Sequence, residues 1–221
     1  MPGTPYIVSD VMSHTVAAVG RRAAFKEIVR LMQDWQVSAL PVLEGEGRVV
    51  GVVSEADLLP KEEFRDSDLD RAAQLRHLTD LAKAGGLTAE DLMTCPALTV
   101  HANATLSQAA RTMAHARVKR LPVVDDTGML QGIVSRADLL KIFLRPDEEI
   151  AVEVRKQVVA DLFPAPVSDV RIEVRNGVVK VIGHARDTAL VPVAARLVRG
   201  VEGVVDVEFE LTGSGRPAAP Q

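Results

Sequence analysis

The chain has 221 residues, of which 47% are hydrophobic and only 3% aromatic, and its formal net charge is −4. This length allows one large domain or two small ones, with a core of Val, Leu, Ile and Ala that suits mixed α/β layers. The charge argues against a nucleic-acid polycation, and because Cys95 is the sole cysteine, an intramolecular disulfide and a CxxC metal site are excluded.

We expect no secretion signal and no membrane-spanning helix in this sequence. The first residues, "MPGTPYIVSDVM", lack the charged and apolar stretches of a secretion signal, and no apolar run approaches the ~20 residues of a membrane helix. We therefore expect a cytoplasmic protein, at most peripheral at a membrane. The tail 213–221, "GSGRPAAPQ", is expected to be disordered.

A phrase occurs twice at an offset of 81 residues: "GVVSEADLL" at 51–59 and "GIVSRADLL" at 132–140. The match extends further, because 18 of the 50 positions from 10 to 59 are identical to their partners, without a gap. A repeat of this length is no solenoid unit and indicates a duplicated small domain with pseudo-two-fold symmetry.

Both copies predict the same elements in the same order. A short strand is expected around 15–19 or 97–100, followed by a helix, a strand at 40–43 or 121–124, a glycine-containing turn, a strand at 49–53 or 130–134, and a last helix. Each first helix has an expected apolar face: Phe25, Ile28, Val29 and Met32 in one copy, and Leu106, Ala109, Ala110 and Met113 in the other.

The charged segment 63–88 between the copies predicts a surface helix that ends at Gly85–Gly86. After residue 146 the pattern changes. A helix over 150–162, strands at 170–174 and 178–183 around Asn176–Gly177, a helix over 187–200 and a strand over 204–211 predict a separate small αββαβ domain.

The repeated phrase has two interpretations. Ser54 and Asp57, like Ser135 and Asp138, have the spacing of a capping box, which stabilises a helix N-terminus by about 1 kcal/mol. Alternatively, the Asp accepts hydrogen bonds from the paired hydroxyls of a ribose and the Ser donates to a phosphate at the helix N-terminus. Gly51 and Gly132 would then let the ligand approach the backbone. The two roles are compatible.

The stretches "LPVL…GVVSEADLL" and "LPVVDDTGMLQGIVSRADLL", each preceded by a "VM" or "LM" opening, resemble tandem CBS repeats (cystathionine-β-synthase type), which together form a Bateman module. The resemblance implies two pseudo-symmetric βαββα repeats at 9–62 and 89–145, packed through their sheets. It also implies clefts that hold AMP, ADP, ATP or S-adenosylmethionine. Carried onto this chain, it assigns ribose to Asp57 and Asp138 and phosphate to Ser54 and Ser135. Adenine would lie between apolar residues near 16–19, 97–100 and the LPV strands.

The copies differ just before the second LPV strand. Lys119 and Arg120 stand where the first copy has Ser38 and Ala39. The resemblance implies phosphate contacts for basic residues at this place, while the alternative is an exposed basic pair. We therefore expect one competent cleft and a weaker or empty second one. The resemblance also implies a homodimer.

Residues 152–211 resemble a BON domain, most specifically in "NGVVKVIG" and "GVEGVVDV", and we set its bounds at 147–212. The resemblance implies attachment to phospholipid surfaces or to a protein partner. Although 147–212 contains 8 basic and 12 acidic residues, the stretch 171–199 contains 6 basic and 2 acidic ones. A local basic patch for lipid is therefore a hypothesis, with a solvated surface as the alternative; its members would be Arg171, Arg175, Lys180, Arg186, Arg196 and Arg199.

Motifs of catalysis are missing from the sequence. It contains no HExxH, GxSxG, P-loop or GxGxxG pattern, and we expect no catalytic residue, no metal and no catalytic cofactor. The sequence favours a non-catalytic regulatory sensor that binds an adenosine nucleotide and relays its presence through the BON domain. The alternative is a ligand-free dimeric scaffold that presents BON domains to a membrane or a protein, and the net charge disfavours nucleic acid as a partner.

Overall fold

The computed structural model describes residues 6–63, 78–164 and 169–213, and the chain divides into two units. The tandem-repeat unit spans 7–139 and contains both copies of the repeated sequence. The C-terminal unit consists of residue 6 and the described residues from 140 onward. The expected helix residues of 64–77 and the expected tail at 214–221 lie outside the described residues, whereas Gly213 belongs to the last strand.

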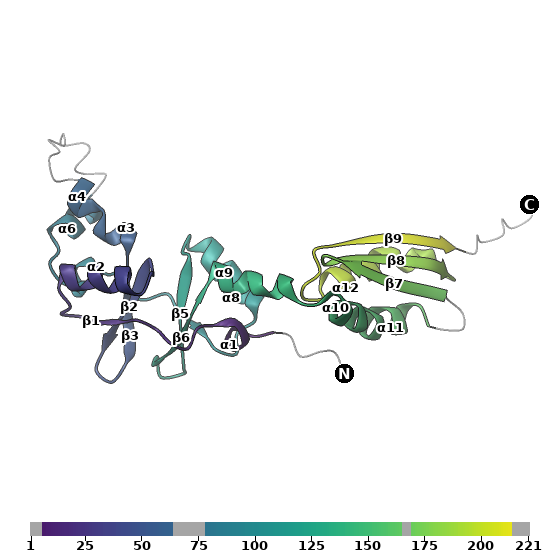
Figure 1. Cartoon of the computed structure of the whole chain (residues 1–221), viewed down its shortest axis with the longest axis horizontal. Coiled ribbons are helices and arrows are strands. Elements are labelled where there is room, and N and C mark those ends of the chain that lie inside the picture. Colours follow the sequence, from purple (N-terminus) through teal and green to yellow (C-terminus); the bar gives the residue numbers. More distant parts are fainter. Residues whose placement is uncertain (1–5, 64–77, 165–168, 214–221) are drawn as a thin grey trace, which may run out of the picture. The chain divides into compact units, whose positions relative to one another are not determined.

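Each repeat folds around a three-stranded sheet (Figure 1). In repeat 1, β1 (Val19–Gly20) pairs in parallel with β2 (Ala39–Glu44), which pairs antiparallel with β3 (Arg48–Ser54). In repeat 2, β4 (Val100–His101), β5 (Arg120–Val124) and β6 (Leu130–Ser135) repeat this pattern. The β2–β3 and β5–β6 turns contain Gly47 and Gly128 at φ 121° and 82°, which favour glycine. The expected mixed α/β fold is confirmed.

The first long helix of each repeat covers its sheet with a narrower apolar face than expected. In α2 (Phe25–Asp34), Ile28 and Met32 are buried, but Val29 is 41% exposed and Phe25 is half-buried. In α8 (Leu106–His115), Leu106, Ala109 and Met113 are buried while Ala110 is exposed. The i+3 and i+7 positions therefore form the core face in both helices, joined by the i position in α8, and the i+4 neighbour turns toward solvent.

The opening segments, 7–13 of repeat 1 and 88–94 of repeat 2, pack on the opposite repeat. Helix α1 (Val8–Val11) lies against repeat 2, where the amide of Val8 donates to Ala104 at 2.9 Å. Helix α7 (Ala89–Leu92) lies against repeat 1, where the amide of Ala89 donates to Ala23 at 2.9 Å. The exchange is reciprocal, since Ser13 pairs with β6 of repeat 2 and Thr94 pairs with β3 of repeat 1.

Short helices follow the last strand of each repeat. In repeat 1 these are α3 (Glu55–Leu58) and α4 (Pro60–Glu63), and in repeat 2 it is α9 (Arg136–Leu140). Between the repeats, α6 (Leu78–Gly85) packs against α3 and α4 and ends at Gly85, as the sequence predicts. The 3-10 helix Lys141–Leu144 follows α9.

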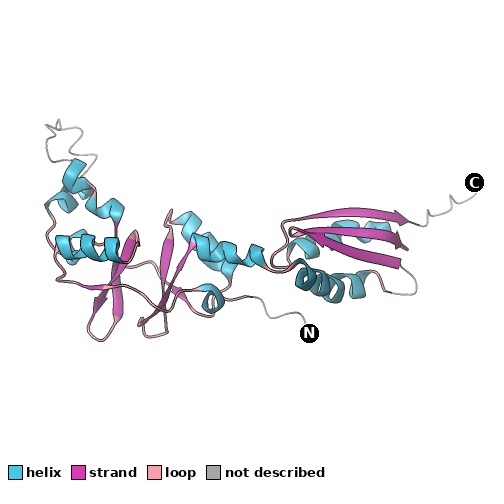
Figure 2. Cartoon of the chain, in the orientation of Figure 1, coloured by secondary structure: helices cyan, strands magenta, loops and turns pink. Residues whose placement is uncertain are grey.

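The C-terminal unit packs helices on one face of a three-stranded sheet (Figure 2). Its first helix runs as α10 (Asp147–Val154), a π-helical turn (Arg155–Val159) and α11 (Ala160–Leu162). Strands β7 (Asp169–Arg175) and β8 (Val178–Ala185) form the expected hairpin. The 3-10 turn Thr188–Leu190 then leads into α12 (Val191–Arg199). The last strand, β9 (Asp206–Gly213), pairs in parallel with β8. The core includes Ile150, Val154, Val181 and Val198.

Asp147 ties the start of α10 to the tip of the β7–β8 hairpin. Its carboxylate accepts the amides of Asn176 at 2.7 Å and Gly177 at 2.8 Å. Both turn residues have positive φ, 51° and 74°, as the two-residue turn of a hairpin requires. The Asn-Gly pair is thus held by its own backbone preference and by a carboxylate from the neighbouring helix.

We expect Gly51→Ala to lower the free energy of unfolding by about 1–3 kcal/mol, because an added Cβ would overlap the Met93 side chain of the exchanged segment. Urea unfolding measures this change. Gly20→Ala is the matched control, since nothing lies within 4 Å of its added Cβ. Equal unfolding midpoints for the two variants would contradict the packing described here.

We expect Asp147→Ala to destabilise the C-terminal unit by about 1–3 kcal/mol through the loss of two hydrogen bonds to a charged acceptor. Hydrogen exchange at the amides of Asn176 and Gly177 should accelerate in this variant. Glu148→Ala changes the neighbouring exposed acid and serves as control. Unchanged exchange at both amides in Asp147→Ala would show that the turn holds without the carboxylate.

Candidate functional site

A cleft of about 490 Å³ lies between the two repeats. The end of β3 and the start of α3 form one wall, with Ser54, Glu55 and Asp57. The opposite wall comes from repeat 2, with the segment 116–120 before and at the start of β5 and the segment around Thr94. The volume falls within the roughly 300–1,000 Å³ typical of small-molecule sites.

Asp57 is the one buried charged residue among those described, at 9% exposure. Its Oδ2 accepts the backbone amide of Ser54 at 2.8 Å and the Ser54 hydroxyl at 2.6 Å. The capping box expected from the sequence is therefore present, and it holds the carboxylate at the first turn of α3. Because Asp57 also lines the cleft, capping and ligand binding are compatible in the same side chain.

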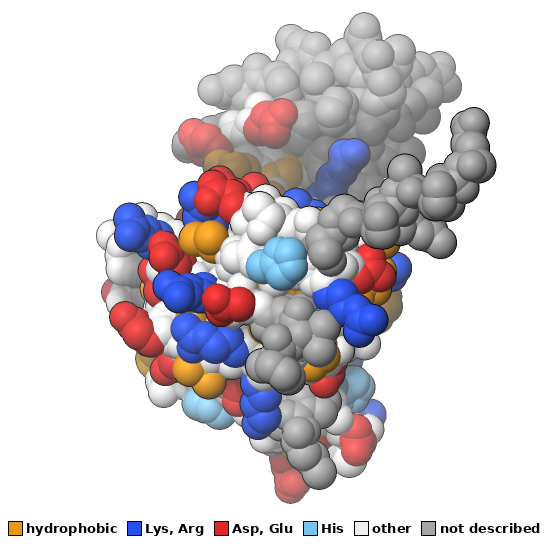
Figure 3. All heavy atoms as spheres, turned by 90° about the vertical axis from the view of Figure 1, so that its right-hand side faces the viewer, with side chains coloured by type: hydrophobic (Ala, Val, Ile, Leu, Met, Phe, Trp, Pro, Cys, Tyr) orange, Lys and Arg blue, Asp and Glu red, His pale blue; other side chains and the backbone are white. Residues whose placement is uncertain are grey.

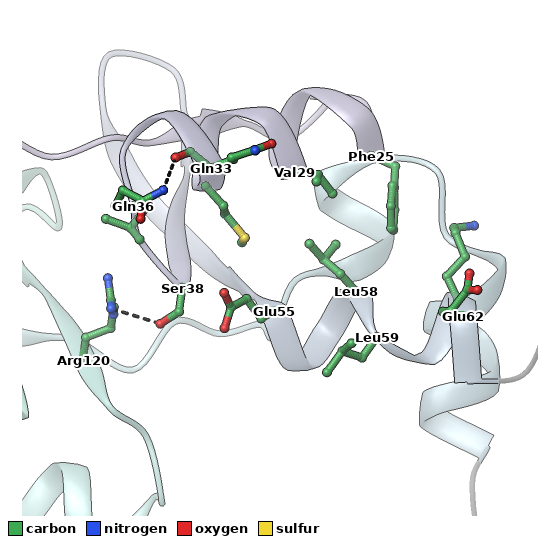
Figure 4. A pocket seen from close by; sticks show the side chains of 13 residues that line it. Phe25, Val29, Gln33, Gln36, Ser38, Glu55, Leu58, Leu59, Glu62 and Arg120 are labelled. Atoms are coloured by element: carbon green, nitrogen blue, oxygen red, sulfur yellow. Dashed lines mark hydrogen bonds between the residues drawn. The ribbon is translucent and has the colours of Figure 1, made fainter.

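The basic side chains of repeat 2 face Asp57 across the cleft. Arg117, Lys119 and Arg120 all line it, and Arg117 adopts a positive φ of 56°. Arg120 reaches from β5 to repeat 1, where its Nη2 donates to the Ser38 hydroxyl at 3.0 Å (Figure 4). Its buried Nε has no acceptor within the part of the chain that the structure describes. A buried donor of this kind gains free energy when an anion supplies an acceptor.

Apolar side chains complete the cleft. They come from both repeats and are Ala39, Val52, Ala56, Pro96, Leu98, Ala116 and Val118. Of the segments expected to contact adenine, 97–100 contributes Leu98, which is 40% exposed. The segment 16–19 does not line this cleft, and the Leu and Val side chains of the LPV strands are core residues instead.

A larger open groove of about 830 Å³ adjoins the cleft on the side of α2 and α3 (Figure 4). Ser38, Glu55 and Arg120 line both hollows. The groove itself is mostly apolar, with Phe25, Val29, Leu58 and Leu59 among its lining residues. Arg120 and Ser38 therefore stand at the boundary between the cleft and the groove.

Ser135 and Asp138 form the same box at the start of α9. The Asp138 Oδ2 accepts the Ser135 amide at 2.9 Å and the Ser135 hydroxyl at 2.6 Å. Neither residue lines the cleft that contains Asp57. The structure thus gives the two copies the same cap, and of the two Ser–Asp pairs only the first lines this cleft with Lys119 and Arg120.

The roles inferred for Gly51 and Gly132 require a correction. An added Cβ at Gly51 would meet the Met93 side chain, and one at Gly132 would meet the Met12 Sδ at 2.8 Å and the Ser13 carbonyl at 2.9 Å. Glycine stands at both places because the exchanged opening segments cross there. Neither glycine lines the cleft, and close packing against the exchanged segments explains why a side chain is absent at both places.

Two residues at Asp57 were missed in the sequence. The Lys83 ammonium of α6 forms an ion pair with the Asp57 Oδ1, and the Thr94 hydroxyl lies 3.4 Å from the same oxygen. Thr94 follows the second "LM" opening and comes to repeat 1 through the segment exchange. Because Lys83 belongs to the charged segment between the copies, no repeat pattern could single it out.

The six basic residues assigned to a surface patch do not gather by themselves. Arg171, Arg175 and Lys180 share the outer face of the C-terminal sheet with acidic neighbours, which are Asp169, Glu173, Asp206, Glu208 and Glu210. Glu210 pairs with Lys180 at 2.7 Å and raises the pKa of Lys180. Arg196 and Arg199 lie on α12, Arg186 follows β8, and Figure 3 shows basic and acidic side chains intermingled.

Within the described ranges, no three His, Cys, Asp or Glu side chains are grouped closely enough to hold a metal ion. The helices in those ranges are all too short or too polar to cross a bilayer.

Comparison with known proteins relates both units to families. The CBS domain model matches residues 8–61 and 89–145, and the BON domain model matches residues 146–213. Protein MJ1426 of Methanocaldococcus jannaschii is 28% identical over 158 residues, which are 64% of this chain and 94% of that protein. The chloroplastic CBS domain-containing protein CBSX2 of Arabidopsis thaliana is 30% identical over 159 residues, 65% of this chain and 66% of that protein.

A solved structure of CBSX2 in complex with AMP is similar to this chain with a TM-score of 0.56. The identity is 31%, over 63% of this chain and 97% of that one. The inosine-5'-monophosphate dehydrogenase of Korarchaeum cryptofilum is 28% identical over 134 residues, but these are only 22% of the enzyme. The similarity to an enzyme is therefore confined to a small part of it.

The family matches, the duplicated α/β sheets and the cleft between them agree: this chain belongs to the CBS domain family, with two CBS repeats forming a Bateman module and a C-terminal BON domain.

Proposed function

We propose that this protein is a non-catalytic regulatory sensor that binds an adenosine nucleotide in the cleft between its CBS repeats. One observation carries the proposal: a buried carboxylate, Asp57, faces the basic side chains of Lys119 and Arg120 across a cleft with apolar lining. These are the three chemistries that a ribose diol, a phosphate and a base require. The AMP complex of CBSX2, which shares the fold and 31% identity, supports it.

Each part of the nucleotide has a partner of matching chemistry. The ribose hydroxyls would donate to Asp57, because a carboxylate accepts two hydrogen bonds from a cis-diol. The phosphate would bind Arg120 and Lys119, with Arg120 offering a planar pair of donors. The adenine would pack between Val52, Leu98 and Val118.

The charges of the cleft favour a phosphorylated nucleotide over S-adenosylmethionine. Arg117, Lys119 and Arg120 face two acidic residues, Glu55 and Asp57. With Asp57 directed at the ribose, the remaining balance is positive and suits an anion. S-adenosylmethionine has a sulfonium and an ammonium against one carboxylate, and a site with a positive balance disfavours its net positive charge.

To act as a sensor, the protein also needs a surface through which nucleotide binding affects a second copy or a partner. In the tandem-repeat unit, Leu59, which follows the first cap, is 62% exposed and Val29 is 41% exposed. Burial of these side chains against a second copy would stabilise a homodimer by the hydrophobic effect. In our proposal the ligand favours one arrangement of the repeats, and the BON domain relays it to a partner in the cytoplasm or at a phospholipid surface.

The alternative function, a scaffold that binds no nucleotide, makes a different prediction for thermal unfolding. A sensor should gain stability with AMP, ADP or ATP at concentrations above Kd, by RT ln(1 + [L]/Kd), and gain less with S-adenosylmethionine. Differential scanning calorimetry with each ligand measures this gain. An unfolding temperature that none of the four ligands raises would favour the scaffold.

We expect Asp57→Asn to weaken AMP binding by about 10- to 100-fold, because the amide cannot accept both ribose hydroxyls as a charged acceptor. Isothermal titration calorimetry measures the affinity. Asp91→Asn is the matched control, since Asp91 caps the short helix α7 through Thr88 with the same geometry but does not line the cleft. Equal AMP affinities in the two variants would show that Asp57 acts as a helix cap and does not bind the ribose.

We expect Arg120→Gln to weaken AMP binding by roughly 10-fold, the loss of one charge-assisted hydrogen bond, while adenosine affinity stays the same. Adenosine lacks the phosphate, so titrating both ligands separates phosphate recognition from damage to the cleft. A parallel loss for adenosine would assign Arg120 to the structure of the cleft through Ser38.

A further inference from the structure

The Asp57 carboxylate already has its full set of hydrogen-bond donors. Its Oδ2 accepts both the amide and the hydroxyl of Ser54. Its Oδ1 accepts the Lys83 ammonium and lies 3.4 Å from the Thr94 hydroxyl. Since a carboxylate offers about four lone-pair sites, a ribose hydroxyl can donate to Asp57 only if a donor that is present leaves.

Lys83 is the donor that can leave without dismantling the fold. The two Ser54 contacts belong to the cap of α3, and Thr94 is held by the strand-like pairing with Val52. Lys83 reaches Asp57 only through its flexible side chain, from a helix outside both repeats. The pair is largely shielded from water, with exposed side-chain fractions of 15% for Lys83 and 12% for Asp57.

The contact is specific to the first copy. At the 81-residue offset of the repeats, Pro2 occupies the place ahead of repeat 1 that Lys83 occupies ahead of repeat 2. The sequence therefore places no lysine ahead of repeat 1 at the position that corresponds to Lys83. This difference between the copies comes from the segment between them, and it affects Asp57, the Asp that lines the cleft.

We propose that Lys83 is an internal competitor for the ribose subsite, so that a nucleotide binds by displacing its ammonium from Asp57. This inference rests on the proposed function and adds a specificity-determining residue to it. It also couples α6 to the ligand. Two lysine side chains connect this helix to repeat 1: Lys83 to Asp57, and Lys61, whose Nζ donates to the Ala84 carbonyl at 2.9 Å. Displacement of Lys83 removes one of these contacts and loosens α6.

The test compares Lys83→Met with the wild-type chain by titration with adenosine, which has the diol but no phosphate to attract a lysine. We expect adenosine to bind roughly 3- to 10-fold tighter to Lys83→Met, because no partly screened ion pair has to break. The gain should disappear in the Asp57→Asn background. Unchanged or weaker binding by Lys83→Met overturns the inference.

Two further variants guard against an indirect effect. Lys83→Arg keeps a competing cation and should bind adenosine as the wild type does. Lys61→Met removes the other lysine contact of α6 without touching Asp57, and it should leave adenosine affinity unchanged. If Lys61→Met tightens binding as much as Lys83→Met does, the effect belongs to α6 as a whole and the competition is refuted.

Hydrogen exchange on the wild-type chain gives a second readout. Saturating AMP should accelerate exchange of the amides in α6, residues 78–85, and this acceleration should be absent in Lys83→Met. Slower or unchanged exchange in the wild type contradicts the coupling. If neither chain binds AMP or adenosine, the proposed function itself fails. If both bind through Asp57 and Lys83→Met gains nothing, only the role of Lys83 fails.

Discussion

The reciprocal exchange of opening segments is the constraint on which the rest of this Bateman module depends. Met93 fills the space beside Gly51, and Met12 fills the space beside Gly132. Each crossing also adds a backbone pair to the neighbouring sheet, Val52 with Thr94 and Ser13 with Ile133. Because the chain crosses in this way, Thr94, Pro96 and Leu98 of repeat 2 come to stand over the cap of repeat 1, and the cleft acquires walls from both copies.

Local and repeated patterns could be predicted from the sequence. The Ser-x-x-Asp spacing predicted capping boxes, and both are formed with hydroxyl to carboxylate distances of 2.6 Å. Asn176–Gly177 predicted the hairpin, because only the positive φ of such residues suits a two-residue turn. Features of this kind depend on neighbours within a few residues. The capping box could also be seen in both copies of the repeated phrase.

Long-range placement could not be predicted in the same way. The glycines of the repeated phrase were interpreted as ligand contacts. The residues near them in the sequence do not indicate that the side chains of Met93 and Met12 pack beside them. The basic residues between 171 and 199 looked concentrated because their acidic partners, Asp206, Glu208 and Glu210, lie on a strand that comes later in the chain. Lys83 lies in a segment without a repeated counterpart, so its contact with Asp57 appears only in three dimensions.

The exchanged opening segments make each repeat depend on the other for part of its packing. A single repeat with its own opening segment would carry a short helix that packs only on the other repeat. The surface beside its Gly51 or Gly132 would then have no opening segment packed on it. A second identical copy would supply the missing helix and accept the surplus one in return. The two-repeat chain is thus equivalent to a symmetric pair of swapped partners joined by one peptide segment. Two joined halves need not stay identical, and Lys119 and Arg120, at the places of Ser38 and Ala39, are positions where they differ.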